Sequence, residues 1–279
     1  MKSVPFFTAS GVRLRRHIQR PGSFNWLLLP GGPGLGADSL FELAETLEVP
    51  GTIWLVDLPG DGSNTDMPEP PGGYYQNWPK ILLEAAQALP NSIYVGHSTG
   101  GMYLLSVPEL ERHIKALVLI GSAPDARWHA RFVDMAIRHP LVAVDTATKR
   151  FADDPTFENF RAIAVASAEW SFTPGSVEAG RKLLARLPYS QTAVAWSDRC
   201  FDHTYQAKWW PKSLPTLILS GSQDCVVAQD LWSDARFHGN NVMHRTVDGG
   251  AHFLWIEKPE EVRAVFSEFA EVVRRWPDI

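Results

Sequence analysis

A serine flanked by glycines is the residue best placed for chemistry in this chain. Residues 96–100 read Gly-His-Ser-Thr-Gly around Ser98, after the apolar run 93–95 and before a stretch of helical spacing. At a sharp turn from strand to helix a serine hydroxyl is exposed at the start of the helix, whose dipole favours developing negative charge. The pattern predicts Ser98 as a nucleophile. The alternative is an ordinary glycine-rich turn.

A serine hydroxyl is a weak nucleophile and needs a base that a carboxylate orients. For a nucleophile at such a turn the expected chain order is serine, acid, histidine. Asp224 follows the apolar run 217–219 and His252 follows the run 242–247, and 28 residues separate them, room for one helix and one strand. We therefore predict Asp224 as the orienting acid and His252 as the base.

Each of these two predictions has a rival. Asp248 lies four residues before His252, although an aspartate beside glycines is more often a turn-former. His97 adjoins the nucleophile, but its side chain is expected to leave the turn in another direction.

Acyl transfer also needs amide donors for the oxyanion of the tetrahedral intermediate. We predict the amide of Thr99 as the first donor, because it follows the nucleophile. The run 26–29 leads into Pro-Gly-Gly-Pro-Gly at positions 30–34, and Pro33 has no amide hydrogen, so Gly32 is the predicted second donor. The alternative is a phosphate-binding loop, but the segment lacks both the GxGxxG spacing and the Lys-Ser/Thr of a P-loop.

The elements that must position these residues alternate along the chain. Apolar runs of strand length are followed by turn residues and then by helical spacing, which predicts an α/β fold with a mostly parallel sheet. The first two runs predict an antiparallel hairpin. Eight strands are expected, at 4–8, 12–18, 26–29, 53–56, 93–95, 117–120, 217–219 and 242–247, with helices on both faces at 39–47, 78–89, 100–105 and 259–275.

The strand rhythm stops at about residue 123 and resumes at 217, so a segment is inserted there. We predict a helical cap at 124–205 on a core made of 1–123 and 206–279. The cap carries ten acidic and ten basic residues, so no single-sign field selects a highly charged substrate. Five tryptophans in or beside the cap either line an apolar pocket or, as is commoner, pack helices onto the core: Trp128, Trp170, Trp196, Trp209 and Trp210.

Composition limits the class of protein. The 279 residues are 45% hydrophobic and 20% charged, which is typical of a folded globular chain, and a net charge of −5 without a basic run argues against nucleic acid as a partner. No apolar stretch approaches the roughly 18 residues that span a bilayer, so we expect no membrane partner and a cytoplasmic location.

Cys200 and Cys225 are expected to be free thiols. We expect a small-molecule substrate and no metal or cofactor; the oligomeric state is left open.

The whole chain resembles an α/β-hydrolase fold protein with a helical cap. The segment Asp-Leu-Pro-Gly-Asp-Gly-Ser at 57–63 is similar to the D-x-x-G-x-G-x-S turn of that superfamily. The glycines at 31–34 resemble the loop of prolyl iminopeptidases, whereas Gly-His-Ser-Thr-Gly-Gly at 96–101 resembles metal-free haloperoxidases and related aryl esterases. The chain departs from the iminopeptidases at Pro30, where they carry histidine, at the serine turn, and at the Asp-Gln-Arg-Gly turn after the fourth strand.

These observations predict a serine hydrolase acting on a small or medium carboxylic ester. An aminopeptidase is the first alternative and would need cap carboxylates to bind a substrate ammonium, with Asp153, Asp154, Glu158, Glu169 and Glu178 as candidates. A non-hydrolytic lyase that uses the same triad is a second alternative. A ligand-binding member of the family without turnover is a third, because a fold by itself does not establish function.

Overall fold

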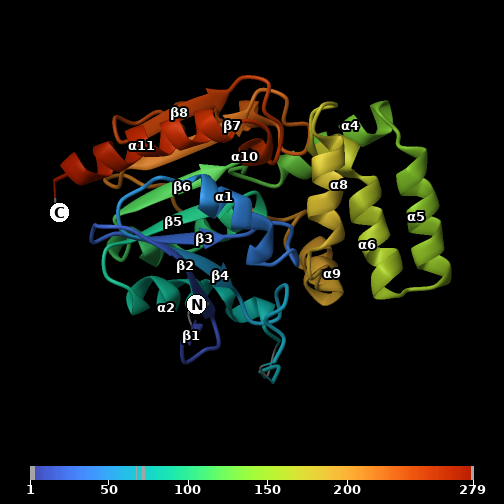
Figure 1. The fold of residues 1–279 in the computed structure, drawn as a ribbon, viewed down its shortest axis with the longest axis horizontal. Helices are drawn as coiled ribbons and strands as arrows, with labels where there is room; N and C mark the ends of the chain where they lie inside the picture. Colours follow the sequence, from blue (N-terminus) through green and yellow to red (C-terminus); the bar gives the residue numbers. More distant parts are fainter. Residues whose placement is uncertain (1–3, 67, 71–72, 278–279) are drawn as a thin grey trace.

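The computed structural model describes residues 4–66, 68–70 and 73–277, and its centre is an open eight-stranded sheet (Figure 1). The strand order is β1-β2-β4-β3-β5-β6-β7-β8. Strand β2 pairs antiparallel with β1 and with β4, and the other five pairings are parallel, which confirms the predicted hairpin and the mostly parallel sheet. The strands are β1 (Phe6–Phe7), β2 (Arg13–Gln19), β3 (Asn25–Leu29), β4 (Thr52–Asp57), β5 (Ser92–His97), β6 (Ala116–Ile120), β7 (Thr216–Gly221) and β8 (Val242–Val247).

Helices cover both faces of the sheet. Successive residues of each central strand point to opposite faces, so each strand contributes apolar side chains to both. In β3, Trp26 and Leu28 belong to the hydrophobic cluster beneath α1 (Phe41–Thr46) and α11 (Pro259–Arg275). Leu27 and Leu29 belong to the cluster beneath α2 (Trp78–Ala88) and α3 (Thr99–Leu104). Shorter helices connect these elements: α10 (Leu254–Glu257), η1 (Ala37–Leu40), η2 (Tyr75–Asn77), η3 (Pro108–Arg112), η4 (Gln229–Trp232) and η5 (Ala235–Phe237).

Between β6 and β7 the chain forms six helices, all within the segment predicted as the cap (Figure 1). Proline residues interrupt this segment because proline cannot continue a helix, and Pro140, Pro155, Pro174 and Pro188 each lie between two helices. The helices are α4 (Arg127–Arg138), α5 (Val142–Asp153), α6 (Phe157–Ala166), α7 (Ala168–Ser171), α8 (Val177–Ala185) and α9 (Gln191–Cys200).

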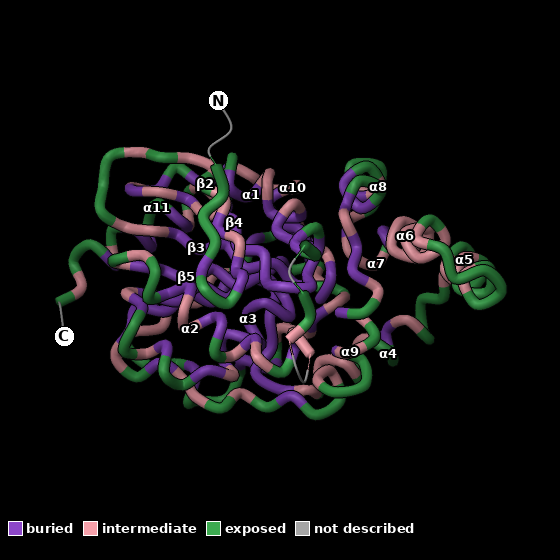
Figure 2. Tube along the Cα trace, turned by 90° about the horizontal axis from the view of Figure 1, so that it is seen from below, coloured by how far each residue is buried: buried purple, intermediate pink, exposed green. Residues whose placement is uncertain are grey.

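The cap has an inner and an outer part (Figure 2). Helices α5 and α6 contain no buried residue, and α5 lies farthest from the sheet. The inner segments α7 and α8 contribute Ala168, Leu183 and Leu184 to the same hydrophobic cluster that includes the sheet. Across the described residues, no helix is both long and apolar enough to cross a bilayer.

Candidate active site

Ser98 lies at the turn between β5 and α3, in a backbone conformation that side chains rarely adopt. Its φ is 51° and its ψ is −124°, and its amide donates to the carbonyl of Ile120 at 2.8 Å, so the end of β6 supports the turn. Such strain persists only where the surroundings over-determine it, and it is common at functional sites. A Cβ at Gly96 would lie 2.6 Å from the Cα of Gly101, so only glycine allows this tight approach of strand and helix.

The glycine loop after β3 packs directly on this turn. A Cβ at Gly31 would lie 2.7 Å from the Cβ of Ser98 and 2.6 Å from the carbonyl oxygen of His97. Gly32 follows with a φ of +121°, and Thr99 is buried as the first residue of α3. The two predicted oxyanion donors therefore come from segments that flank the serine.

Asp224 and His252 come together as the sequence order predicts. Asp224 Oδ2 lies 3.0 Å from His252 Nδ1, and the Asp224 side chain is fully buried. Its other oxygen, Oδ1, accepts the amides of Val226 at 2.9 Å and Val227 at 3.0 Å. Because a carboxylate only accepts, the histidine hydrogen is on Nδ1, and Nε2 is left as the acceptor that a general base requires.

Asp248 is not the partner of His252. It is exposed, and its Oδ1 accepts the hydroxyl of Ser222 at 3.1 Å, while the Ser222 hydroxyl accepts the amide of Gly249 at 2.9 Å. Asp248 therefore belongs to the turn after β8, as its glycine neighbours suggest.

Gly121 is the point at which the serine, the acid and the base converge. Its φ is +51°, and a Cβ there would lie 3.2 Å from both Asp224 Oδ2 and His252 Nδ1. The residue before it, Ile120, accepts the amide of Ser98. The carboxyl end of β6 thus has the serine turn on one side and the acid–histidine pair on the other.

The sequence analysis missed the contact between His97 and His252. The His97 ring packs on the His252 ring with centroids 4.7 Å apart, and its Nε2 lies 3.1 Å from the His252 carbonyl oxygen, which only accepts. Burial, and then the neighbouring His252, hold the pKa of His97 well below its usual value, so His97 is neutral. It supports the backbone of His252 without adding charge.

Glu257, in α10, is a second residue that sequence reasoning missed. Its carboxylate accepts the amide of Ala251 at 2.6 Å, and the amide and hydroxyl of Thr173 at 2.6 and 2.7 Å. The amide of His252 donates to the carbonyl of Ser171, in the cap helix α7, at 3.2 Å. The loop that carries His252 is therefore bound to the inner cap through one carboxylate and one backbone bond.

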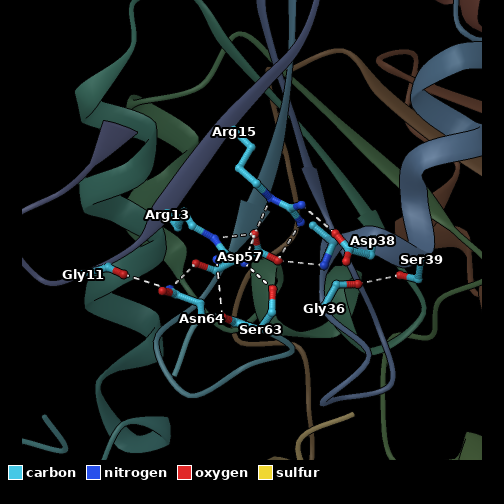
Figure 3. Close-up of polar contacts among 10 residues, drawn as sticks. Gly11, Arg13, Arg15, Gly36, Asp38, Ser39, Asp57, Ser63 and Asn64 are labelled. Atoms are coloured by element: carbon cyan, nitrogen blue, oxygen red, sulfur yellow. Dashed lines mark hydrogen bonds and ion pairs between the residues drawn. The ribbon is translucent and has the colours of Figure 1, made fainter. Parts of the chain in front are cut away.

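Asp57, at the end of β4, binds the segment that follows the glycine loop (Figure 3). Its buried carboxylate accepts Arg13 Nη2 at 3.0 Å and Arg15 Nε at 2.8 Å, and also the amide of Ala37 at 2.9 Å. These bonds join β2, β4 and the segment that follows the glycine loop, so the aspartate of the superfamily-like turn has a structural role.

Asp61 is a buried carboxyl in the same region. Burial, and then the neighbouring Asp57, raise its pKa to about 7, against the effect of backbone hydrogen bonds from the amides of Gly34, Gly36 and Gly62. Its Oδ1 has no hydrogen-bond partner among the described residues. The carboxyl group therefore holds the glycine loop through backbone bonds and is partly protonated near neutral pH.

Of the five tryptophans, Trp196 and Trp128 pack the cap against the core, whereas the contacts of Trp170 lie within the cap and those of Trp209 and Trp210 within the core. Trp196 packs edge-on against Trp78 at 5.8 Å, and Trp209 and Trp170 donate to backbone carbonyls. Trp210 packs against Trp232. Trp128 differs because it packs on the small cluster that contains Met102, Ala123 and Val227, residues that closely follow Ser98, Gly121 and Asp224 in the chain.

A family model described as the alpha/beta hydrolase family matches residues 26–265. The chain belongs to the alpha/beta hydrolase family. The resemblance inferred from the sequence motifs is thereby confirmed at the level of the superfamily, and with it the expectation of an α/β-hydrolase enzyme.

Curated relatives of this alpha/beta hydrolase include esterases. A pimeloyl-acyl-carrier-protein methyl ester esterase of Xanthomonas campestris pv. campestris is 31% identical over 255 residues, which is 91% of this chain and 98% of the relative. The biotin biosynthesis bifunctional protein BioHC of Saccharophagus degradans is 26% identical over 88% of this chain, which spans only 44% of that longer protein.

Solved structures show the same fold at low identity. A proline iminopeptidase-related protein from Thermus thermophilus matches with a TM-score of 0.71 and 19% identity, over 98% of this chain and 99% of that one. Iminopeptidase-like proteins are thus among the structural neighbours of this alpha/beta hydrolase, as the glycine loop at 31–34 led us to expect.

Proposed function

We propose that the protein is a serine esterase in which Ser98, His252 and Asp224 form the catalytic triad. The observation that carries the proposal is the 3.0 Å contact between Asp224 and His252 beside the strained turn of Ser98. In a serine hydrolase the acid holds the imidazole in the tautomer and orientation that let it take the serine proton, and this contact places Asp224 in that role.

In the proposed reaction the Ser98 hydroxyl oxygen attacks the ester carbonyl carbon, and His252 Nε2 takes the hydroxyl proton. The tetrahedral intermediate collapses, the carbon–oxygen bond of the ester breaks, and His252 returns the proton to the leaving alcohol. Water then attacks the acyl-serine, with His252 again as the base, and the carboxylic acid leaves. Asp224 keeps the imidazole in the required tautomer and stabilises its charged form.

The amides of Gly32 and Thr99 are proposed as the oxyanion donors. The Thr99 amide begins α3, where the helix dipole favours negative charge, and Gly32 lies in the loop that touches the Ser98 turn through Gly31. Donors held in place before the reaction need no reorganisation as charge develops.

The substrate proposed is a carboxylic ester of small or medium size, with the methyl ester of an acyl chain as the first candidate. The names of the curated relatives, which are methyl ester esterases, support this choice. The nearly balanced charge of the cap agrees with an ester that carries no net charge near the reacting bond.

The aminopeptidase alternative gains no support from the cap carboxylates. Glu169 pairs with Arg181 and Glu178 with Lys182, and Asp154 accepts the side chain of Asn159. These carboxylates and the remaining candidates, Asp153 and Glu158, are exposed. An exposed carboxylate is a weak site for a substrate ammonium because water screens the interaction.

A fluorophosphonate probe tests the proposal together with a substrate panel. We expect covalent labelling at Ser98, hydrolysis of p-nitrophenyl butyrate and of acyl methyl esters, and no cleavage of proline p-nitroanilide. Ser98→Ala should lower kcat by about 10⁶ and leave the melting temperature nearly unchanged. Ser106→Ala is the matched control, because Ser106 follows α3 and its hydroxyl donates to the carbonyl of Met102 in that helix.

Three results would contradict the proposal. Absence of labelling at Ser98 would favour a ligand-binding protein, and cleavage of the proline amide without ester hydrolysis would favour the aminopeptidase. A Ser98→Ala protein that retains a tenth of the activity would remove this serine from the mechanism.

A further inference from the structure

Two histidines and an aspartate meet at the base of the cap. His129 is in the first turns of α4, Asp198 is in α9, and His203 follows α9. One nitrogen or oxygen atom from each of the three side chains lies within 4.8 Å of the other two. The His129 and His203 rings have centroids 4.2 Å apart, and His203 Nε2 lies 3.5 Å from Asp198 Oδ1.

The fold brings these segments together through the backbone. The amide of Ala126, three residues before His129, donates to the carbonyl of Tyr205, two residues after His203, at 2.8 Å. The amide of Ala207 donates to the carbonyl of Pro124 at 2.9 Å. The chain therefore leaves and re-enters the core at one place, and the two histidines face one another just above it.

The turn after α9 places His203 back over the helix. The amides of Phe201 and Asp202 both donate to the carbonyl of Ser197, at 2.8 and 2.9 Å, and the Ser197 hydroxyl donates to Asp202 Oδ1 at 2.9 Å. The Phe201 ring stacks on Tyr205 at 5.0 Å. The position of His203 beside Asp198 is thus set by an anchored turn.

Two imidazoles and a carboxylate are a donor set that suits Zn²⁺ and similar transition-metal ions. Ligand atoms about 2.0–2.2 Å from one tetrahedral Zn²⁺ are roughly 3.3 Å apart, so rotation of these side chains by small angles brings all three to a common ion. Another pair of histidines, the stacked rings of His238 and His244, lacks this arrangement, because the Nε2 atom of each lies at hydrogen-bond distance from a backbone carbonyl oxygen.

We propose that His129, Asp198 and His203 form a binding site for one divalent transition-metal ion of the Zn²⁺ type. The ion would join the helix that opens the cap to the segment that closes it, and so would stabilise the cap base. Water would complete the coordination, because two of the three side chains are exposed. None of the three residues has a role in the proposed ester hydrolysis.

Zinc titration of chelator-treated protein tests this proposal. We expect one Zn²⁺ per chain by calorimetry or competition with a chromophoric chelator, and a higher melting temperature with Zn²⁺ but not with Mg²⁺, since an ion that binds only the folded state stabilises it. His129→Asn and His203→Asn should each weaken binding at least tenfold and remove the thermal shift. The Ser98→Ala protein should bind Zn²⁺ as the unmodified chain does.

His113→Asn is the matched control, because His113 is exposed just before β6, at the edge of the sheet opposite the cap. It should leave both the affinity and the thermal shift unchanged. Circular dichroism of the metal-free variants checks that they fold. Absence of Zn²⁺ binding, or binding that the two cap substitutions weaken no more than His113→Asn does, would overturn the proposal.

Discussion

At the scale of single residues, the site depends on which carboxyl groups are ionised and what they touch. Both carboxylate oxygens of Asp224 have partners: two backbone amides bind one oxygen and His252 binds the other. Asp61 is buried, and its Oδ1 has no hydrogen-bond partner among the described residues. Burial and the neighbouring Asp57 raise the pKa of Asp61 more than its backbone hydrogen bonds lower it. Asp61 is therefore partly protonated near neutral pH.

Asp224→Asn should reduce kcat by about 10³–10⁴, because the amide favours the wrong histidine tautomer. Asp248→Asn, which changes an exposed turn residue bonded to Ser222, should reduce kcat less than about threefold. Steady-state ester hydrolysis by the two variants, each checked for folding, gives the comparison. The reverse ranking would assign the orienting role to Asp248.

Asp61→Asn should stabilise the protein at alkaline pH and have little effect at acidic pH. The folded-state pKa of Asp61 is raised to about 7, above the usual aspartate value of about 4. The contribution of Asp61 to the free energy of unfolding is therefore fully present below about pH 4 and is lost as the pH rises through about 7. Asparagine stays neutral throughout. We expect a gain of about 1 kcal/mol or more at pH 8, measured by urea unfolding at pH 5 and pH 8; an equal effect at both pH values would refute the assignment.

At the scale of elements, the position of His252 depends on α10 and on the inner cap together. The loop after β8 is held by Glu257, which also binds Thr173, and by the bond from His252 to Ser171. The Phe172 ring stacks on Phe253 at 5.0 Å. The inner cap therefore contributes to the position of His252, the proposed base.

Glu257→Gln should lower kcat/KM for esters by about three- to tenfold and destabilise the fold by about 1–2 kcal/mol, because the amide and hydroxyl donors of Ala251 and Thr173 all lose a charged acceptor, and the amide nitrogen of glutamine cannot accept a hydrogen bond. Fluorophosphonate labelling of Ser98 should slow to a similar degree. Glu261→Gln, an exposed change one element further along in α11, is the control and should alter neither quantity. A Glu257→Gln protein with unchanged kinetics and stability would show that the bridge to the cap does not position His252.

At the scale of the whole molecule, the core and the inner cap share one hydrophobic cluster. Phe172, Leu183 and Leu187 of the cap are buried in the same cluster as Phe253 and Trp255 of the core. Removal of the whole cap would expose this surface to water. The free-energy cost is about 25 cal/mol for each Å² of apolar area exposed. The outer helices α5 and α6 have no buried residue, although Phe157 and Phe160 of α6 pack half-buried against the same cluster.

Replacement of residues 139–167 by a short Gly/Ser linker should therefore give a soluble, folded protein that still hydrolyses p-nitrophenyl acetate but shows altered kcat/KM for bulky esters. Replacement of residues 124–205 should give an aggregated protein. Size-exclusion chromatography, circular dichroism and kinetics with both esters distinguish the outcomes. A soluble and active protein without residues 124–205 would mean that the inner cap is not part of the core.

The sequence by itself determined the α/β fold and the residues best suited to acyl transfer. Strand and helix periodicities are local properties, and the serine turn with Ser98 is a short motif whose glycines have a steric reason. Strand ends in a parallel sheet lie at one edge, so the order of Ser98, Asp224 and His252 along the chain predicts that they meet.

Only the tertiary structure decided what surrounds those residues. The contact of His97 with His252, the bridge from Glu257 to the cap and the high pKa of Asp61 each join segments whose proximity no local pattern encodes. Periodicity shows which face of a helix is buried, but not which distant loop covers it, because that depends on how the side chains of the whole domain pack. For the same reason the inner and outer parts of the cap became distinct only in three dimensions.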